Sequence, residues 1–184
     1  MTRATRTALL AIIVVVGAAA LHAATLKFEA PAGWVSKPPA STMRVVEYTL
    51  PKVAPDTEDA ALAVYFFGPQ AGTVQANLDR WIGQMTQPDG RASKDVARTS
   101  TFQTTSGLKV SLVDLTGTYV AEMSPGSADH FNKPGFRLRA AVIETPEGSY
   151  YVKLTGPAAT VAKWDKEFVA FVKSARVDAY EGQR

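Results

Sequence analysis

The chain has 184 residues, a formal net charge of +3, two histidines and no cysteine. The missing cysteine excludes a thiolate nucleophile, a thiolate metal site and the acylated cysteine of a lipoprotein. Without the N-terminal segment that carries Arg3 and Arg6, 18 basic and 17 acidic residues remain, which is too balanced to predict nucleic-acid binding.

The N-terminal segment has the parts of a secretory signal peptide. Arg3 and Arg6 precede an uncharged run over 8–21, and the small residues Ala23 and Ala24 follow it. This order of basic, apolar and small residues is typical of a signal peptide. We therefore expect a signal peptide over 1–23, one domain over 24–184, and a periplasmic or secreted location. Because His22 makes the cleavage site less than ideal, an uncleaved membrane anchor is the alternative.

The first part of the domain reads as strands followed by one helix. A short strand at 26–30, a β-rich stretch at 42–50 and an apolar run at 61–67 are predicted, with 61–67 as a central strand. The acidic stretch 56–59 between them is expected to be a solvated loop. Apolar residues at helical spacing predict a helix that begins after the N-cap Thr73. They are Val74, Leu78, Trp81, Ile82 and Met85.

The second part reads as four strands and a final helix. Strands are expected at 97–105 and 108–120 around a tight turn at 106–107, then a half-buried strand at 136–142 after a loop at 123–135. A hairpin turn at 146–148 leads into a strand at 150–155. Gly156 and Pro157 open a helix with an apolar stripe that includes Trp164 and Phe168. The order predicts an α+β domain with an antiparallel β-sheet and helices packed on it.

Catalytic constellations are poorly represented. His130 is the one histidine of the expected mature chain, it lies in the 123–135 loop, and no Gly-x-Ser-x-Gly or phosphate-binding loop accompanies it. Asp56, Glu58 and Asp59 lack the glycine and the closing glutamate of a calcium loop. We therefore expect no enzyme activity, no metal and no cofactor.

Polar residues on the first helix form one candidate site. Asn77, Arg80 and Gln84 recur at spacings of three and four, so they lie along one edge of the apolar stripe. They either hydrogen-bond the adjoining loop and fix the helix on the sheet, or form a small polar site for a ligand carboxylate or a partner backbone.

Basic residues on the late strands form a second candidate. Arg137, Arg139 and Lys153 alternate with apolar residues, and Lys109 is a further member. Together they predict either a solvated sheet face or a basic patch for an anionic partner.

Patterns at both ends of the domain resemble a known fold. The turn Pro31-Ala-Gly-Trp34, the apolar strand over 61–67 with its following helix, and the close over 150–157 before a helix with Trp164, Phe168 and Phe171 resemble the PsbP-like fold. This fold includes PsbP, Mog and DcrB-type lipoproteins. The run 75–90 is also similar to a family of uncharacterised exported bacterial proteins. The resemblance implies an α/β/α sandwich with a role in binding or assembly, and it transfers no site.

The function expected from these observations is binding without catalysis. The first expectation is an exported accessory protein of the bacterial cell envelope that acts through a protein partner. The alternative is a periplasmic small-ligand-binding protein that uses the edge of the first helix. The membrane is a partner only if the signal segment stays uncleaved, and the sequence carries no pattern that indicates an oligomeric state.

Overall fold

The computed structural model describes residues 26–69 and 71–177. The predicted signal peptide lies outside these residues. In the described part, no helix combines the length and the apolar character needed to cross a membrane.

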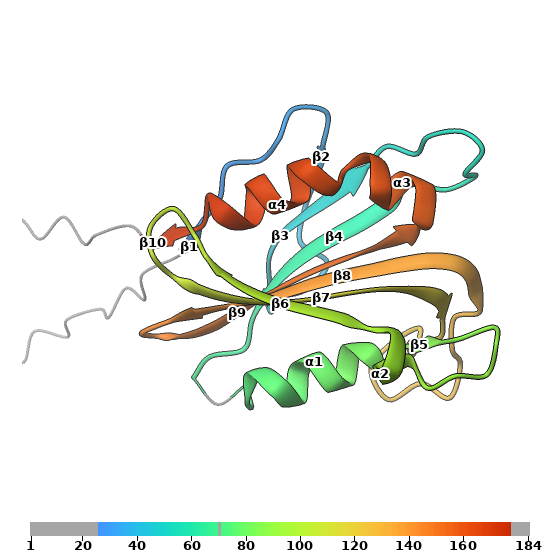
Figure 1. Ribbon diagram of the computed structural model, residues 1–184. Coiled ribbons are helices and arrows are strands. Elements are labelled where there is room, and N and C mark those ends of the chain that lie inside the picture. Colours follow the sequence, from blue (N-terminus) through green and yellow to red (C-terminus); the bar gives the residue numbers. More distant parts are fainter. Residues whose placement is uncertain (1–25, 70, 178–184) are drawn as a thin grey trace, which may run out of the picture.

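An antiparallel β-sheet dominates the fold (Figure 1). Its strand order is β2-β3-β4-β9-β8-β7, and both β5 and β6 pair with β7. The strands are β2 (Val35–Lys37), β3 (Arg44–Leu50), β4 (Ala60–Phe66), β5 (Met85–Thr86), β6 (Arg98–Gln103), β7 (Lys109–Tyr119), β8 (Lys133–Thr145) and β9 (Gly148–Pro157). A separate pair joins β1 (Leu26–Lys27) to β10 (Arg176–Val177), so the two ends of the described chain meet.

The helices lie on opposite sides of the sheet (Figure 1). The helices α3 (Ala158–Lys163) and α4 (Asp165–Lys173) cover one face, and α1 (Val74–Ile82) covers part of the other, with the short α2 (Ser93–Val96) beside it. The chain is therefore a mixed α/β protein with mostly antiparallel strands, as predicted, and its strands outweigh its helices.

Each face of the sheet has its own core. Phe168, Phe171 and Val172 of α4 pack with Leu112 and Leu154 on one face. On the other face, α1 inserts Leu78 and Trp81 against a second set from β7, β8 and β9. That set comprises Val113, Leu115, Leu138, Ala140, Val142 and Tyr151. Because alternate residues of a strand point to opposite faces, β7, β8 and β9 supply both cores.

Several predicted elements hold and others need correction. Thr73 caps α1 as predicted, since its Oγ1 accepts a hydrogen bond from the Ala76 amide at 3.2 Å. Met85, predicted within the first helix, instead lies in β5, because α1 ends at Ile82. The strand predicted as half-buried is buried on both faces over 138–143, and the final helix breaks at Trp164 into α3 and α4. The one-turn α2 was not predicted.

Candidate functional site

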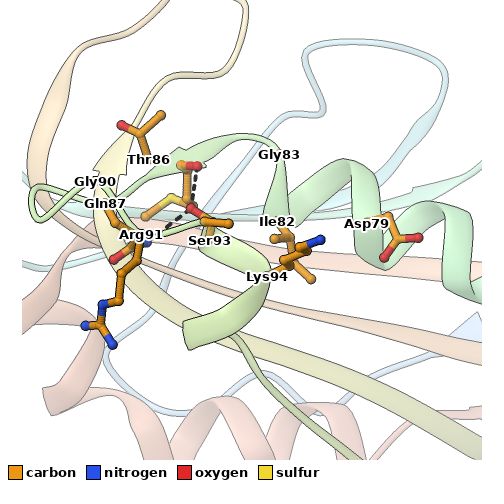
Figure 2. Close-up of a pocket in the computed structure, with 11 residues that line it drawn as sticks. Asp79, Ile82, Gly83, Thr86, Gln87, Gly90, Arg91, Ser93 and Lys94 are labelled. Atoms are coloured by element: carbon orange, nitrogen blue, oxygen red, sulfur yellow. Dashed lines mark hydrogen bonds between the residues drawn. The ribbon is translucent and has the colours of Figure 1, made fainter.

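The grooves that open on the described surface include two of the size of small-molecule sites. The larger, about 530 Å³, lies between the end of α1, β5 and α2, and Figure 2 shows its lining. Its central polar groups bind one another: Ser93 Oγ donates to the Met85 carbonyl at 2.7 Å, and Gln87 Nε2 donates to Ser93 Oγ at 3.2 Å. Arg91 pairs with Asp89. Gln87, Ser93 and Arg91 of this groove therefore bind partners within the protein.

The smaller groove, about 330 Å³, lies on the part of the α1 face that α1 leaves uncovered. Small residues of β4 and the polar residues of β3 and β9 form its floor, and aromatic residues of β7, β8 and the loop between them form a wall. The groove falls within the size of small-molecule sites. We call it the Lys153 groove. Its lining holds four cations and three carboxylates, which are Lys37, Arg44, Lys133 and Lys153, and Glu47, Glu58 and Asp59. The rest of the lining is neutral and comprises Tyr48, Thr49, Ala61, Leu62, Ala63, Tyr65, Tyr119, Phe131, Phe136 and Thr155.

Lys153 stands between alanines of both neighbouring strands. In the register of the sheet it lies opposite Ala63 of β4 and Ala140 of β8. Its Nζ donates hydrogen bonds to the Tyr119 hydroxyl at 2.9 Å and to Gln84 Oε1 at 2.5 Å, and it lies 4.9 Å from the centre of the Tyr119 ring. Both acceptors are neutral. Among the described residues, no carboxylate forms an ion pair with Lys153.

The backbone around β5 holds these two acceptors in place. Met85 pairs with Tyr119, and the Val120 amide donates to the Gln84 carbonyl at 2.8 Å. This approach needs a glycine at Gly117, because a Cβ there would lie 2.4 Å from the Thr86 carbonyl oxygen. The turn after α1 thus fixes Gln84 and Tyr119 on one side of the lysine.

The surroundings of Lys153 disfavour its positive charge. Burial, followed by the neighbouring charges of Arg80 and Arg44, lowers the pKa of Lys153 from 10.5 to about 8. The residue keeps some exposed area, so the ammonium remains within reach of the groove. Burial likewise raises the pKa of Tyr119 to about 12, so that its hydroxyl keeps its proton at neutral pH.

Two other cations of the groove are paired with carboxylates. Arg44 bonds Glu47 at 2.8 Å, and Lys133 bonds Glu58 at 2.9 Å at the rim. Arg80 differs from both, because its hydrogen-bond partner is the amide oxygen of Asn77 at 2.8 Å and not a carboxylate. In the described part of the chain, Lys153 and the exposed Lys37 of the groove lining, together with Arg80 on α1, therefore lack a carboxylate partner.

The residues predicted on the first helix separate into two roles. Asn77 is only 4% exposed, and its Nδ2 donates to the Ala71 and Thr73 carbonyls at 3.1 and 2.9 Å. It therefore fixes the start of α1, which is one of the two roles considered for it. Gln84 instead reaches Lys153, and the charge of Arg80 acts on the same lysine.

The predicted basic patch of Arg137, Arg139 and Lys153 is wrong as a single surface. Lys153 lies opposite Ala140, whereas Arg139 lies opposite Leu154, so the two point to opposite faces of the sheet. Arg137 and Arg139 form ion pairs with Asp114 and Asp165. Lys109 pairs with Glu144 at 3.0 Å. The period-2 pattern was sound within each strand, but the register between β8 and β9 separates the residues.

The prediction for the acidic loop over 56–59 needs a correction. Asp56 was expected in a solvated loop, yet its Oδ2 accepts hydrogen bonds from the Thr160 amide and hydroxyl at 2.7 and 2.6 Å, so it holds the start of α3. The described residues contain no group of three or more potential metal ligands.

The sequence analysis did not identify Tyr119 as a site residue, because no pattern along the chain indicates that its hydroxyl contacts a lysine 34 residues away.

No protein-family model and no curated protein sequence matches the chain. A solved structure that is similar is that of a protein of unknown function from Pseudomonas aeruginosa, described as a "Putative Regulator". The two share 13% sequence identity over 81% of this chain and 94% of that one, with a TM-score of 0.44.

Proposed function

We propose that the protein is a non-catalytic small-ligand-binding protein whose Lys153 groove holds a ligand with an anionic group. The observation that carries this proposal is the ammonium of Lys153, which has two neutral hydrogen-bond acceptors and two cationic neighbours. A cation in this setting costs free energy of folding, and a ligand anion would offset that cost. Strongly perturbed groups in a cleft are candidates for function for this reason.

The groove also supports a ligand of a defined shape. Tyr119 stacks on Phe131 and on Phe136, with ring centres 5.5 and 6.2 Å apart, which forms a flat aromatic wall. Ala61 and Ala63 on the floor leave space where larger side chains would fill it. A small planar molecule with a carboxylate fits both features, since the wall offers stacking and the Lys153 ammonium, which has no carboxylate partner among the described residues, offers charge pairing.

With this proposal we place the small-ligand-binding alternative above the protein-partner function that we expected first from the sequence. It keeps the other parts of the expected function: export to the periplasm or outside the cell, directed by the segment over 1–23, and binding without catalysis. The element order and the helices on both sides of the sheet support a PsbP-like α/β/α sandwich as the finer assignment of the fold.

The test uses benzoate as the probe, because it is planar and carries one carboxylate. NMR titration of the ¹⁵N-labelled protein should shift the amides of Lys153, Tyr119 and Gln84, and Lys153→Met should weaken binding at least tenfold. The matched control is Lys109→Met, which removes an exposed lysine from an ion pair outside the groove. Equal binding by wild type and Lys153→Met, or no binding together with a crosslinked protein partner from the producing cell, would overturn the proposal.

A further inference from the structure

We infer that the Lys153 amine is a covalent acceptor for small carbonyl compounds that carry a carboxylate, which it holds as an imine at the floor of the groove. The inference rests on the proposed function, since it uses the same groove, and it adds the chemical class of the ligand. Imine formation is reversible and needs no oxidant or reductant, so it is a mode of binding rather than turnover.

The first support is the contrast between Lys153 and the other described lysines. Eight of them are exposed at the surface, and Lys133 is paired with Glu58. Lys153 alone combines a half-buried position in a groove with neutral hydrogen-bond acceptors. An amine that is shielded from water and lies next to other cations has a larger unprotonated fraction, and the unprotonated form is the nucleophile.

The second support is the hydroxyl of Tyr119. It lies 2.9 Å from Nζ, and burial keeps it protonated at neutral pH. The lone pair of Nζ adds to the carbonyl carbon, a C–N bond forms, and the electrons of the carbonyl π bond move to oxygen. That oxygen takes a proton from Tyr119, which recovers one from the nitrogen. The carbinolamine then loses water as the C=N bond forms, so atoms and charges balance.

The third support concerns the carboxylate of the ligand. Arg80 is exposed, it has no carboxylate partner among the described residues, and its charge acts on Lys153. A guanidinium binds a carboxylate through paired N–H donors, which holds the attached carbonyl in one orientation. Ala63, which lies opposite Lys153 on β4, lines the groove beside it with a small side chain that leaves room for such a ligand.

The experiment traps the imine with glyoxylate as the probe. The purified full-length protein is incubated with glyoxylate and sodium cyanoborohydride at pH 8, and peptide mapping by mass spectrometry locates the carboxymethyl group. We expect Lys153 to be labelled at least about tenfold faster than any other lysine. Unfolding the protein in urea should abolish this preference. Propionaldehyde, which has no carboxylate, should label Lys153 more slowly, and Arg80→Gln should remove the difference between the two probes.

Matched variants separate this inference from the proposed function. Tyr119→Phe keeps the aromatic wall and should slow labelling several-fold, whereas Lys109→Arg, outside the groove, should leave the labelling of Lys153 unchanged. Uniform labelling of all lysines, with benzoate still bound in a Lys153-dependent way, would overturn the imine and leave the proposed function standing. Uniform labelling without such benzoate binding would overturn both. Circular dichroism of each variant confirms that it is folded.

Discussion

The buried and half-buried cations on the two faces of the sheet differ in whether a carboxylate neutralises them. On the α4 face, Arg137 bonds Asp114 through two nitrogens at 2.8 and 2.6 Å, and Arg139 bonds Asp165 at 2.5 Å. These hydrogen bonds raise the pKa of Arg137 above its ordinary value, against the lowering effect of burial. On the α1 face, Lys153 has no carboxylate partner in the described part of the chain, and its pKa falls to about 8.

The difference teaches how to separate a structural charge from a functional one. Two arginines with two carboxylates are neutral as a group, and their ion pairs join β7 and β8 to the start of α4. A lysine placed between cations destabilises the fold in which it lies. Residues that lower the free energy of unfolding without contributing to the packing of the fold are expected at functional sites.

The largest expected effect comes from breaking the paired cluster. Asp114→Asn leaves Arg137 and the 7%-exposed Arg139 with Asp165 as their one shared carboxylate, so the free energy of unfolding should fall by about 3 kcal/mol. Urea unfolding followed by fluorescence measures it. A loss below about 1 kcal/mol would show that water, rather than Asp114, neutralises these arginines.

An effect of opposite sign is expected on the other face. Lys153→Met should stabilise the protein at pH 7 by on the order of 2 kcal/mol, because it removes the unpaired charge but also two hydrogen bonds. The gain should shrink as pH rises from about 8 toward 10.5. In that window the folded wild type has released the proton of Lys153 while the unfolded chain still binds it, so wild-type stability rises with pH.

The measurement is a series of urea unfolding curves for both proteins from pH 7 to pH 10. Burial raises the pKa of Tyr119 to about 12, so this neighbour of Lys153 keeps its proton in the folded wild type over the whole range. A variant that is less stable than wild type at pH 7, or a difference that does not change with pH, would contradict the assignment of Lys153 as an unpaired buried cation.

The smallest effect is expected at the rim of the Lys153 groove. Lys133 and Glu58 form an ion pair at 2.9 Å, with side chains 40% and 44% exposed. Glu58→Gln should therefore cost only about 0.2–1 kcal/mol, and the cost should decrease as salt is added. A loss as large as that of Asp114→Asn would mean that exposure does not explain the contrast between the clusters.

The sequence by itself determined most of the elements and their antiparallel order. Thr73 as the N-cap, Trp81 in the core at 3% exposure, and the turns at 106–107 and 146–148 depend on local spacing and on glycine, so a single sequence carries them. Met85 was misplaced because its spacing continues the helical stripe, while pairing with Tyr119 decides that it is a strand residue.

The candidate site was decided by the tertiary structure. Alternation along β8 and β9 indicated correctly that Arg139 and Lys153 each point to the face opposite that of the residues beside them in the chain. The register between the two strands, however, places Arg139 and Lys153 on opposite faces of the sheet. Lys153, Gln84 and Tyr119 come from three elements up to 69 residues apart. Local patterns report which residues are polar, but only the packing of strands decides which charges find a partner, because a carboxylate must lie within a few ångströms of a cation to neutralise it.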